Sequence, residues 1–158
     1  MIKGDKLKAH IHAHCVVARV SRTVSDAART RVYPDGFYKV VTPLHVFKKV
    51  HHEINGHKVD AIANLIIPVG ALIFAPHYSF WAFNSADGRK MRASEAEVHS
   101  IVTKRAKKQV NIAIATRCRR FEYKVGTTVK PELRFSRCGD QCESGIHFFV
   151  NLADAKSW

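Results

Sequence analysis

Hydrophobic and polar residues alternate with a period of two in several short stretches of the chain. Such alternation is typical of β-strands that bury one face. Nearly continuous apolar residues from Val59 to Ile67 indicate a buried central strand. The pattern predicts strands over residues 10–20, 37–41, 44–51, 57–67, 71–74, 98–103, 110–114, 121–125 and 146–150.

Turn signals separate these strands. Asn55-Gly56 lies between two apolar runs, which is the strongest short-range signal of a β-hairpin. Pro34-Asp35-Gly36 predicts a second hairpin, because proline fixes φ and glycine tolerates positive φ. Asn151 is a good N-cap for a closing helix over residues 152–158. The fold class predicted is mainly β (α+β): a single compact domain of about eight to ten short strands, barrel- or sandwich-like, with a short C-terminal helix.

The length of 158 residues suits one domain with a sizeable core. We expect residues 1–8 to form a basic N-terminal tail and residues 9–158 to form a single β-rich domain. No apolar run is long enough to cross a bilayer, and the first residues lack the apolar segment of a secretory signal. We therefore expect neither membrane insertion nor secretion.

Positive charge dominates the composition. Lysine and arginine number 26 against 13 aspartates and glutamates, a net charge of +13, and such a surface attracts polyanions. Clustered cations bind phosphates, and the neighbouring rings of Phe121 and Tyr123 could stack on bases. The alternative is a solvated basic face without a dedicated ligand. The predicted nucleic-acid- or anion-binding residues are Lys104, Arg105, Lys107, Lys108, Arg117, Arg119, Arg120, Arg134 and Arg137.

His10, His12, His14 and Cys15 form the densest group of metal-ligating residue types. On a strand, the three histidines would share one face at spacings of about 7 Å. Adjacent histidines of that kind can bind zinc together with ligands from elsewhere. The alternative is a polar strand face that binds nothing, and no cofactor other than this candidate zinc is expected.

Three blocks of sequence carry a resemblance. The first is Asn64-Leu65-Ile66-Ile67-Pro68, and the second is residues 88–98 (GRKMRASEAEV). The third runs from residues 123–131 (YKVGTTVKP) to residues 142–149 (CESGIHFF), followed by Ala155 and Trp158. Together they resemble the uncharacterised C-terminal domain that accompanies pentapeptide repeats in giant-virus and phage proteins. The resemblance covers residues ~60 to 158 and implies a viral origin, although the repeats are absent here and that domain has no established activity.

The last block is also similar to a strand–helix element of ADP-ribosyltransferases. That resemblance implies a small-molecule pocket beside Ser144, Gly145 and His147. The catalytic glutamate of those enzymes has no matching position here. We therefore expect no catalytic residues and no enzymatic activity.

The function expected is that of a non-enzymatic viral accessory or virion-associated binding module. It would dock a basic surface on an anionic partner, either nucleic acid or an acidic protein complex. Two alternatives remain: a structural minor component of a capsid or assembly, and an ADP-ribosyltransferase-like relic that binds a small molecule. The expected location is the host cell cytoplasm or the virion.

Overall fold

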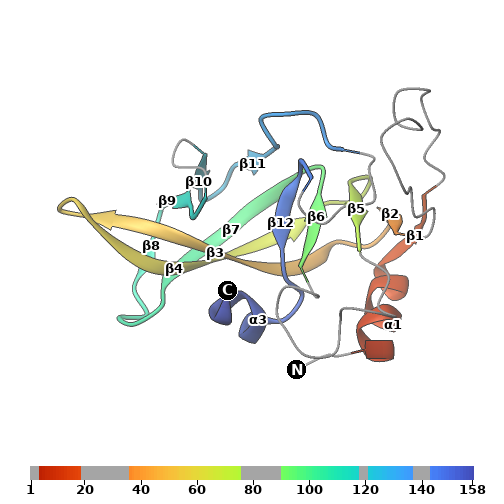
Figure 1. Ribbon diagram of the computed structural model, residues 1–158, viewed down its shortest axis with the longest axis horizontal. Coiled ribbons are helices and arrows are strands. Elements are labelled where there is room, and N and C mark those ends of the chain that lie inside the picture. The colour runs from red at the N-terminus through yellow and green to blue at the C-terminus, as the bar shows by residue number, and fades with distance from the viewer. Residues whose placement is uncertain (1–3, 19–35, 76–89, 118–120, 137–142) are drawn as a thin grey trace.

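The structure is a computed structural model that describes residues 4–18, 36–75, 90–117, 121–136 and 143–158. The described residues form twelve strands in two antiparallel sheets, with one helix near each end of the chain (Figure 1). One of the sheets is curved into a half-barrel. The predicted fold class, mainly β with a short C-terminal helix, is confirmed.

Both sheets draw their strands from distant parts of the sequence. The first has five strands in the order β1 (Cys15–Val17), β2 (Phe37–Val40), β5 (Leu72–Phe74), β6 (Met91–Ala93) and β12 (Ile146–Phe148). The second has the order β10 (Glu122–Lys124), β9 (Ile112–Ala115), β3 (Leu44–Ile54), β4 (His57–Ile67), β7 (Ala96–Thr103) and β11 (Thr128–Val129), and β8 (Gln109–Val110) also pairs with β7.

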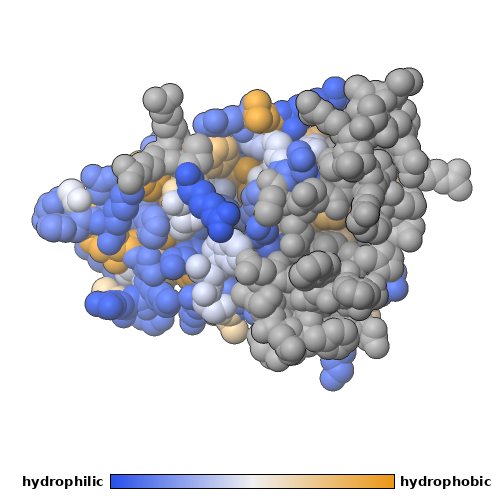
Figure 2. Space-filling view, in the orientation of Figure 1, coloured by the Kyte–Doolittle hydropathy of each residue, from blue (hydrophilic) through white to orange (hydrophobic). Residues whose placement is uncertain are grey.

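The longest strands, β3 and β4, form one hairpin and pair along their whole length. Asn55 and Gly56 form its turn with φ angles of 51° and 77°. Positive φ at both positions suits a turn that matches the twist of the strands, so the hairpin predicted from Asn-Gly is confirmed. The hairpin extends to the left of the other strands in Figure 1, and hydrophilic side chains cover much of that end in Figure 2.

Alternate residues of β3 point into the core. Leu44, Val46 and Val50 are fully buried, as the period of two requires. Lys48 holds the remaining position of this series and is only partly buried. An amine therefore lies on the core side of the sheet, among positions that are otherwise aliphatic.

The strand expected over residues 10–20 is wrong for its first half. Residues Gly4–His14 form a helix, α1, and Cys15–Val17 are the only described residues of the expected range that form a strand. Leu7 and Ile11 are each 1% exposed, and Cys15 follows at 5%. A spacing of four residues places these side chains on one helical face, which packs on the core.

The same helical face includes part of the segment expected to be a basic N-terminal tail, residues 1–8, of which residues 1–3 lie outside the described residues. The chain is helical from Gly4, and the buried Leu7 ties this segment to the core. Burial of a leucine side chain stabilises such a contact by about 1.5–3 kcal/mol. The basic Lys6 and Lys8 remain exposed on the outer side of the helix.

The C-terminal segment links the two sheets. Just after β12, Phe149 exchanges two backbone hydrogen bonds of 2.8 Å with Phe47 of β3. Helix α3 (Leu152–Ser157) then packs beside β3. Asn151 holds the predicted N-cap position, but its side-chain amide donates to the Asp154 carboxylate at 2.9 Å instead of accepting from a backbone N–H.

Two short strands, β6 and β11, are absent from the sequence predictions. All three residues of β6 are buried, so they show no alternation that could reveal a strand. Pro34 and Asp35, the first residues of the predicted second turn, lie outside the described residues. Neither described helix is long and apolar enough to span a bilayer.

Candidate functional site

A pocket of about 570 Å³ is lined by residues of both sheets. Lys48 of β3 and Tyr123 of β10 come from the larger sheet, and His147 of β12 comes from the smaller one. Loop residues around Leu133 and the C-terminal Trp158 complete the wall. A cavity of this size is in the range of small-molecule sites.

Lys48 extends its amine into this pocket from the core-facing side of β3. Its Nζ donates a hydrogen bond of 3.0 Å to the carbonyl oxygen of His147 and lies 5.9 Å from the centre of the Tyr123 ring. Burial, together with the charges of Lys90 and Arg117, lowers the pKa of Lys48 from 10.5 to about 8. The amine is therefore crowded by positive charge.

The two neighbouring cations meet on Trp158. Lys90 Nζ lies 4.7 Å from the centre of the indole ring, and Arg117 Cζ lies 5.2 Å from it. Lys90 is 7% exposed, whereas Arg117 is exposed at the pocket wall. Cations over an aromatic face are held by the ring quadrupole, which fixes both charges beside the cavity.

Two carboxylates also line the pocket, Glu132 and Glu143. Both residues are exposed to solvent, so water screens their charges more than those of the partly buried Lys48 and the buried Lys90. The inner part of the pocket is therefore positive, and the acidic residues belong to its solvated side.

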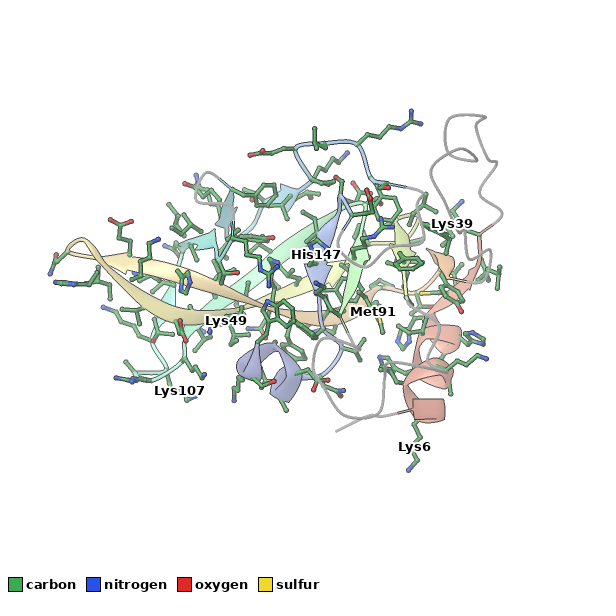
Figure 3. The ribbon with its side chains drawn as sticks, in the orientation of Figure 1. Lys6, Lys39, Lys49, Met91, Lys107 and His147 are labelled. Atoms are coloured by element: carbon green, nitrogen blue, oxygen red, sulfur yellow. The ribbon has the colours of Figure 1, made fainter. Side chains whose placement is uncertain are left out.

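Ser144, Gly145 and His147, named from the sequence as a candidate pocket, all lie in its wall. His147 alternates with the buried Ile146 and Phe148, and Figure 3 shows it on β12 near the centre of the molecule. Ser144 Oγ donates to the carbonyl oxygen of Leu133 at 2.8 Å. This hydrogen bond joins two loops of the wall.

Gly145 is required by a close approach to Arg92. A Cβ added at residue 145 would lie 2.9 Å from Arg92 Cβ and 3.3 Å from the Ala93 carbonyl oxygen. Only glycine leaves room for β12 to begin at this distance from β6. The glycine of the CESGIHFF block therefore has a packing role.

Arg92 is fully buried and holds the loops beside the pocket. Its Nη1 donates to the carbonyl oxygens of Ser136 at 2.6 Å and Ser144 at 3.1 Å. Its guanidinium also lies 4.8–5.7 Å from the centres of three phenylalanine rings, those of Phe37, Phe74 and Phe135. This cation is committed to structure and is not a ligand-binding group.

The predicted basic residues are only partly brought together. Lys104, Arg105, Lys107 and Lys108 share the turn between β7 and β8, where Figure 3 places Lys107 well away from His147. Lys104 Nζ donates to the carbonyl oxygen of Lys156 at 3.0 Å, at the end of α3. Arg117 alone of the predicted set lines the pocket, Arg134 is exposed on a loop, and Arg119, Arg120 and Arg137 lie outside the described residues.

The proposed strand face of histidines does not exist. His10, His12 and His14 lie on helix α1, so His10 and His14 are neighbours with ring centres 4.7 Å apart, whereas His12 contacts Tyr38. Cys15 is buried, and burial raises the pKa of its thiol to about 11. Within the described ranges, no group of three or more His, Cys, Asp or Glu residues could hold a metal ion.

Residues 23–155 match the model of a family of unknown function (DUF5758). The chain belongs to this family. No curated protein and no solved structure matches the chain. The expectation of an uncharacterised domain is therefore confirmed.

Lys48 and Lys90 are absent from the residues proposed from the sequence. Lys48 could have been found, because it interrupts the buried series Leu44, Val46 and Val50 at the same phase. A lysine in the apolar phase of a strand signals a charge directed inward. Lys90 has no comparable signal, since its position depends on the fold around Trp158.

Proposed function

We propose that the chain is a non-enzymatic binding module that seats an anionic group of its partner among Lys48, Lys90 and Arg117. The observation that carries the proposal is the convergence of these three cations on one cavity. Burial, together with repulsion from Lys90 and Arg117, lowers the pKa of Lys48, and a bound anion would relieve that repulsion. The contacts with the anion and the relief of repulsion among the cations would then both favour the bound state.

A phosphate of nucleic acid is the anion that the pocket suits best. Phe121, Tyr123 and Trp158 line the same cavity, so aromatic surface lies beside the cations. Phosphate contacts from lysine and arginine combined with aromatic surface are typical of proteins that bind single strands without strict sequence preference. The net charge of +13 would draw such a partner towards the chain.

The biological setting proposed is that of a viral accessory or virion-associated protein. The resemblance of residues ~60 to 158 to a domain of giant-virus and phage proteins supports it. A module of this kind would attach a basic surface to nucleic acid during assembly or within the particle.

The proposal is tested by fluorescence anisotropy with a short labelled single strand at low salt. R117A should weaken binding about tenfold, because it removes a charged phosphate contact. R134A is the matched control, since Arg134 is also exposed but lies outside the pocket wall, and it should change affinity by less than about twofold. Equal losses in the two variants, or no binding by the wild type, would contradict the proposal. Tight binding of an acidic peptide alone would favour an acidic protein partner.

A small-molecule role is the second candidate. The positions of Ser144, Gly145 and His147 in the pocket wall support it, because the resemblance to ADP-ribosyltransferases implies a ligand there. Ligand binding raises the melting temperature by mass action. A shift with millimolar NAD that is lost in R117A would favour this role, and no shift would remove it.

A further inference from the structure

The amine of Lys48 has an environment that suits covalent chemistry as well as anion binding. The groups that face it from the surrounding elements are Tyr123, His147, Lys90, Arg117 and, at the solvated side, Glu132 and Glu143. Within the described part of the chain, no carboxylate lies within ion-pair distance of its Nζ. The amine donates the hydrogen bond to the His147 carbonyl oxygen, so this contact orients the amine and leaves its lone pair available.

Crowded cations and partial burial favour the uncharged amine. With a pKa of about 8, roughly 10% of Lys48 is uncharged at pH 7, against roughly 0.03% of an ordinary lysine. An uncharged amine is a nucleophile, and lysines placed beside other cations or desolvated in pockets are activated in this way. Lys48 combines both conditions inside a cavity with room for a ligand.

We propose that Lys48 forms an imine with an aldehyde or ketone that carries a phosphate or carboxylate group. Arg117 and Lys90 would hold the anionic group while the carbonyl carbon meets Lys48 Nζ in the same pocket. The anionic part of this inference rests on the proposed function, whereas the reactivity of the amine does not. The chemistry goes beyond binding, because a covalent bond to the chain is formed.

The reaction balances without an oxidant or reductant. The Nζ lone pair forms a bond to the carbonyl carbon, and the carbonyl π electrons move to oxygen, which takes up one of the two amine protons. The resulting carbinolamine loses its hydroxyl group together with the remaining Nζ proton as water, and the C=N bond forms. One amine and one carbonyl compound thus yield one imine and one water.

Lys49 is a matched control one residue away. It points to the opposite side of β3, where its Nζ pairs with the Asp60 carboxylate at 3.2 Å. Its side chain is 19% exposed, so it is similarly limited in access. The two neighbouring lysines differ in their surroundings: Lys48 lies in the pocket beside Lys90 and Arg117, whereas Lys49 pairs with Asp60 outside it.

The test uses two aldehydes with sodium cyanoborohydride at pH 7, which reduces each imine to a stable amine that mass spectrometry can map. Formaldehyde, a neutral reagent, reports the reactivity of each amine. Pyridoxal 5′-phosphate is an anionic aldehyde, so its reaction rate also reports whether the pocket binds an anionic group. We expect both reagents to modify Lys48 at least tenfold faster than Lys49 at low conversion. R117A should slow the reaction with pyridoxal 5′-phosphate more than the reaction with formaldehyde, because it removes a contact to the phosphate as well as one of the charges that lower the pKa of Lys48.

The remaining outcomes separate the causes of failure. If formaldehyde modifies Lys48 no faster than Lys49, the amine is not activated and the inference is overturned, while the anion site of the proposed function can still stand. If formaldehyde favours Lys48 but pyridoxal 5′-phosphate does not, the anionic substrate class is wrong and the proposed function fails with it. K48M and K49M, each checked by circular dichroism, confirm which lysine carries each adduct.

Discussion

Lys48 Nζ and the carbonyl oxygen of His147 are joined by a hydrogen bond of 3.0 Å that connects β3 to β12. The two strands belong to different sheets, so this contact spans the pocket wall where the sheets come together. It holds a cation whose pKa is lowered to about 8 beside a second and a third cation. A lowered pKa means that the charged amine costs stability in the folded protein, and in the proposed function an anion would offset that cost.

The first prediction concerns the pH dependence of stability. Because the pKa of Lys48 is lower in the folded chain than in the unfolded chain, the unfolded chain holds more protons between pH 8 and 10.5. The free energy of unfolding should therefore gain a rising contribution from Lys48 across this window. K48M should lose that rise, measured by urea denaturation at pH 7.5 to 10.

Cys15 also contributes to the pH dependence of stability, so the experiment compares wild type with K48M. Its pKa is raised from 9.0 to about 11, so its own contribution falls as pH rises from 9 to 11. Wild type and K48M share Cys15, and the difference between them isolates Lys48. A difference that stays constant with pH would show that the pKa of Lys48 is not lowered by folding.

The second prediction concerns Gly145. G145A should destabilise the fold by about 1–3 kcal/mol, because the new methyl group would meet Arg92 Cβ at 2.9 Å. S144A is the comparison, since it removes only the exposed hydrogen bond to Leu133 and should cost less. Thermal unfolding of both variants checks the order. A G145A protein as stable as the wild type would mean that β12 and β6 are farther apart than the structure shows.

The third prediction concerns the N-terminal helix. L7A should cost about 2–5 kcal/mol, because Leu7 is 1% exposed and its truncation leaves a cavity. K6A, on the exposed side of the same helix, should leave stability within about 0.5 kcal/mol of the wild type. If L7A were as neutral as K6A, residues 4–8 would be the loose tail that composition alone suggests.

The fourth prediction concerns the carboxylates of the pocket. E132Q and E143Q should each strengthen phosphate binding by about two- to fivefold, because each removes an exposed negative charge near the bound anion. E53Q is the control, since Glu53 is exposed near the end of the β3–β4 hairpin and does not line the pocket. Calorimetry at low salt measures all three. Equal effects of E132Q and E53Q would place the anion elsewhere.

Local patterns predict the elements that have one buried face and a clear turn. The bounds of β4 and its turn at Asn55-Gly56 follow directly from alternation and Asn-Gly chemistry. The segment from His10 to His14 fails, because a histidine at every second position imitates a strand. The decisive signal there is the four-residue spacing of Leu7, Ile11 and Cys15, which is helical.

The site is less predictable than the fold, because it depends on contacts between distant residues. A resemblance indicates Ser144, Gly145 and His147, and the clustering of basic residues indicates Arg117. Lys90 becomes part of the site only when Trp158 folds back beside it. The density of basic residues along the sequence indicates the exposed β7–β8 turn as the anion site. The pocket, in contrast, is lined by single cations from separate parts of the chain.

The most direct test is the pKa of Lys48 itself, measured by nuclear magnetic resonance on lysine-labelled protein with and without saturating phosphate. K48R assigns the signal. We predict a pKa of about 8 in the free protein and a clear rise when phosphate binds, with a smaller rise in R117A. An ordinary lysine pKa in the free protein, or a pKa that phosphate leaves unchanged, would contradict the account of a cationic pocket built for an anion.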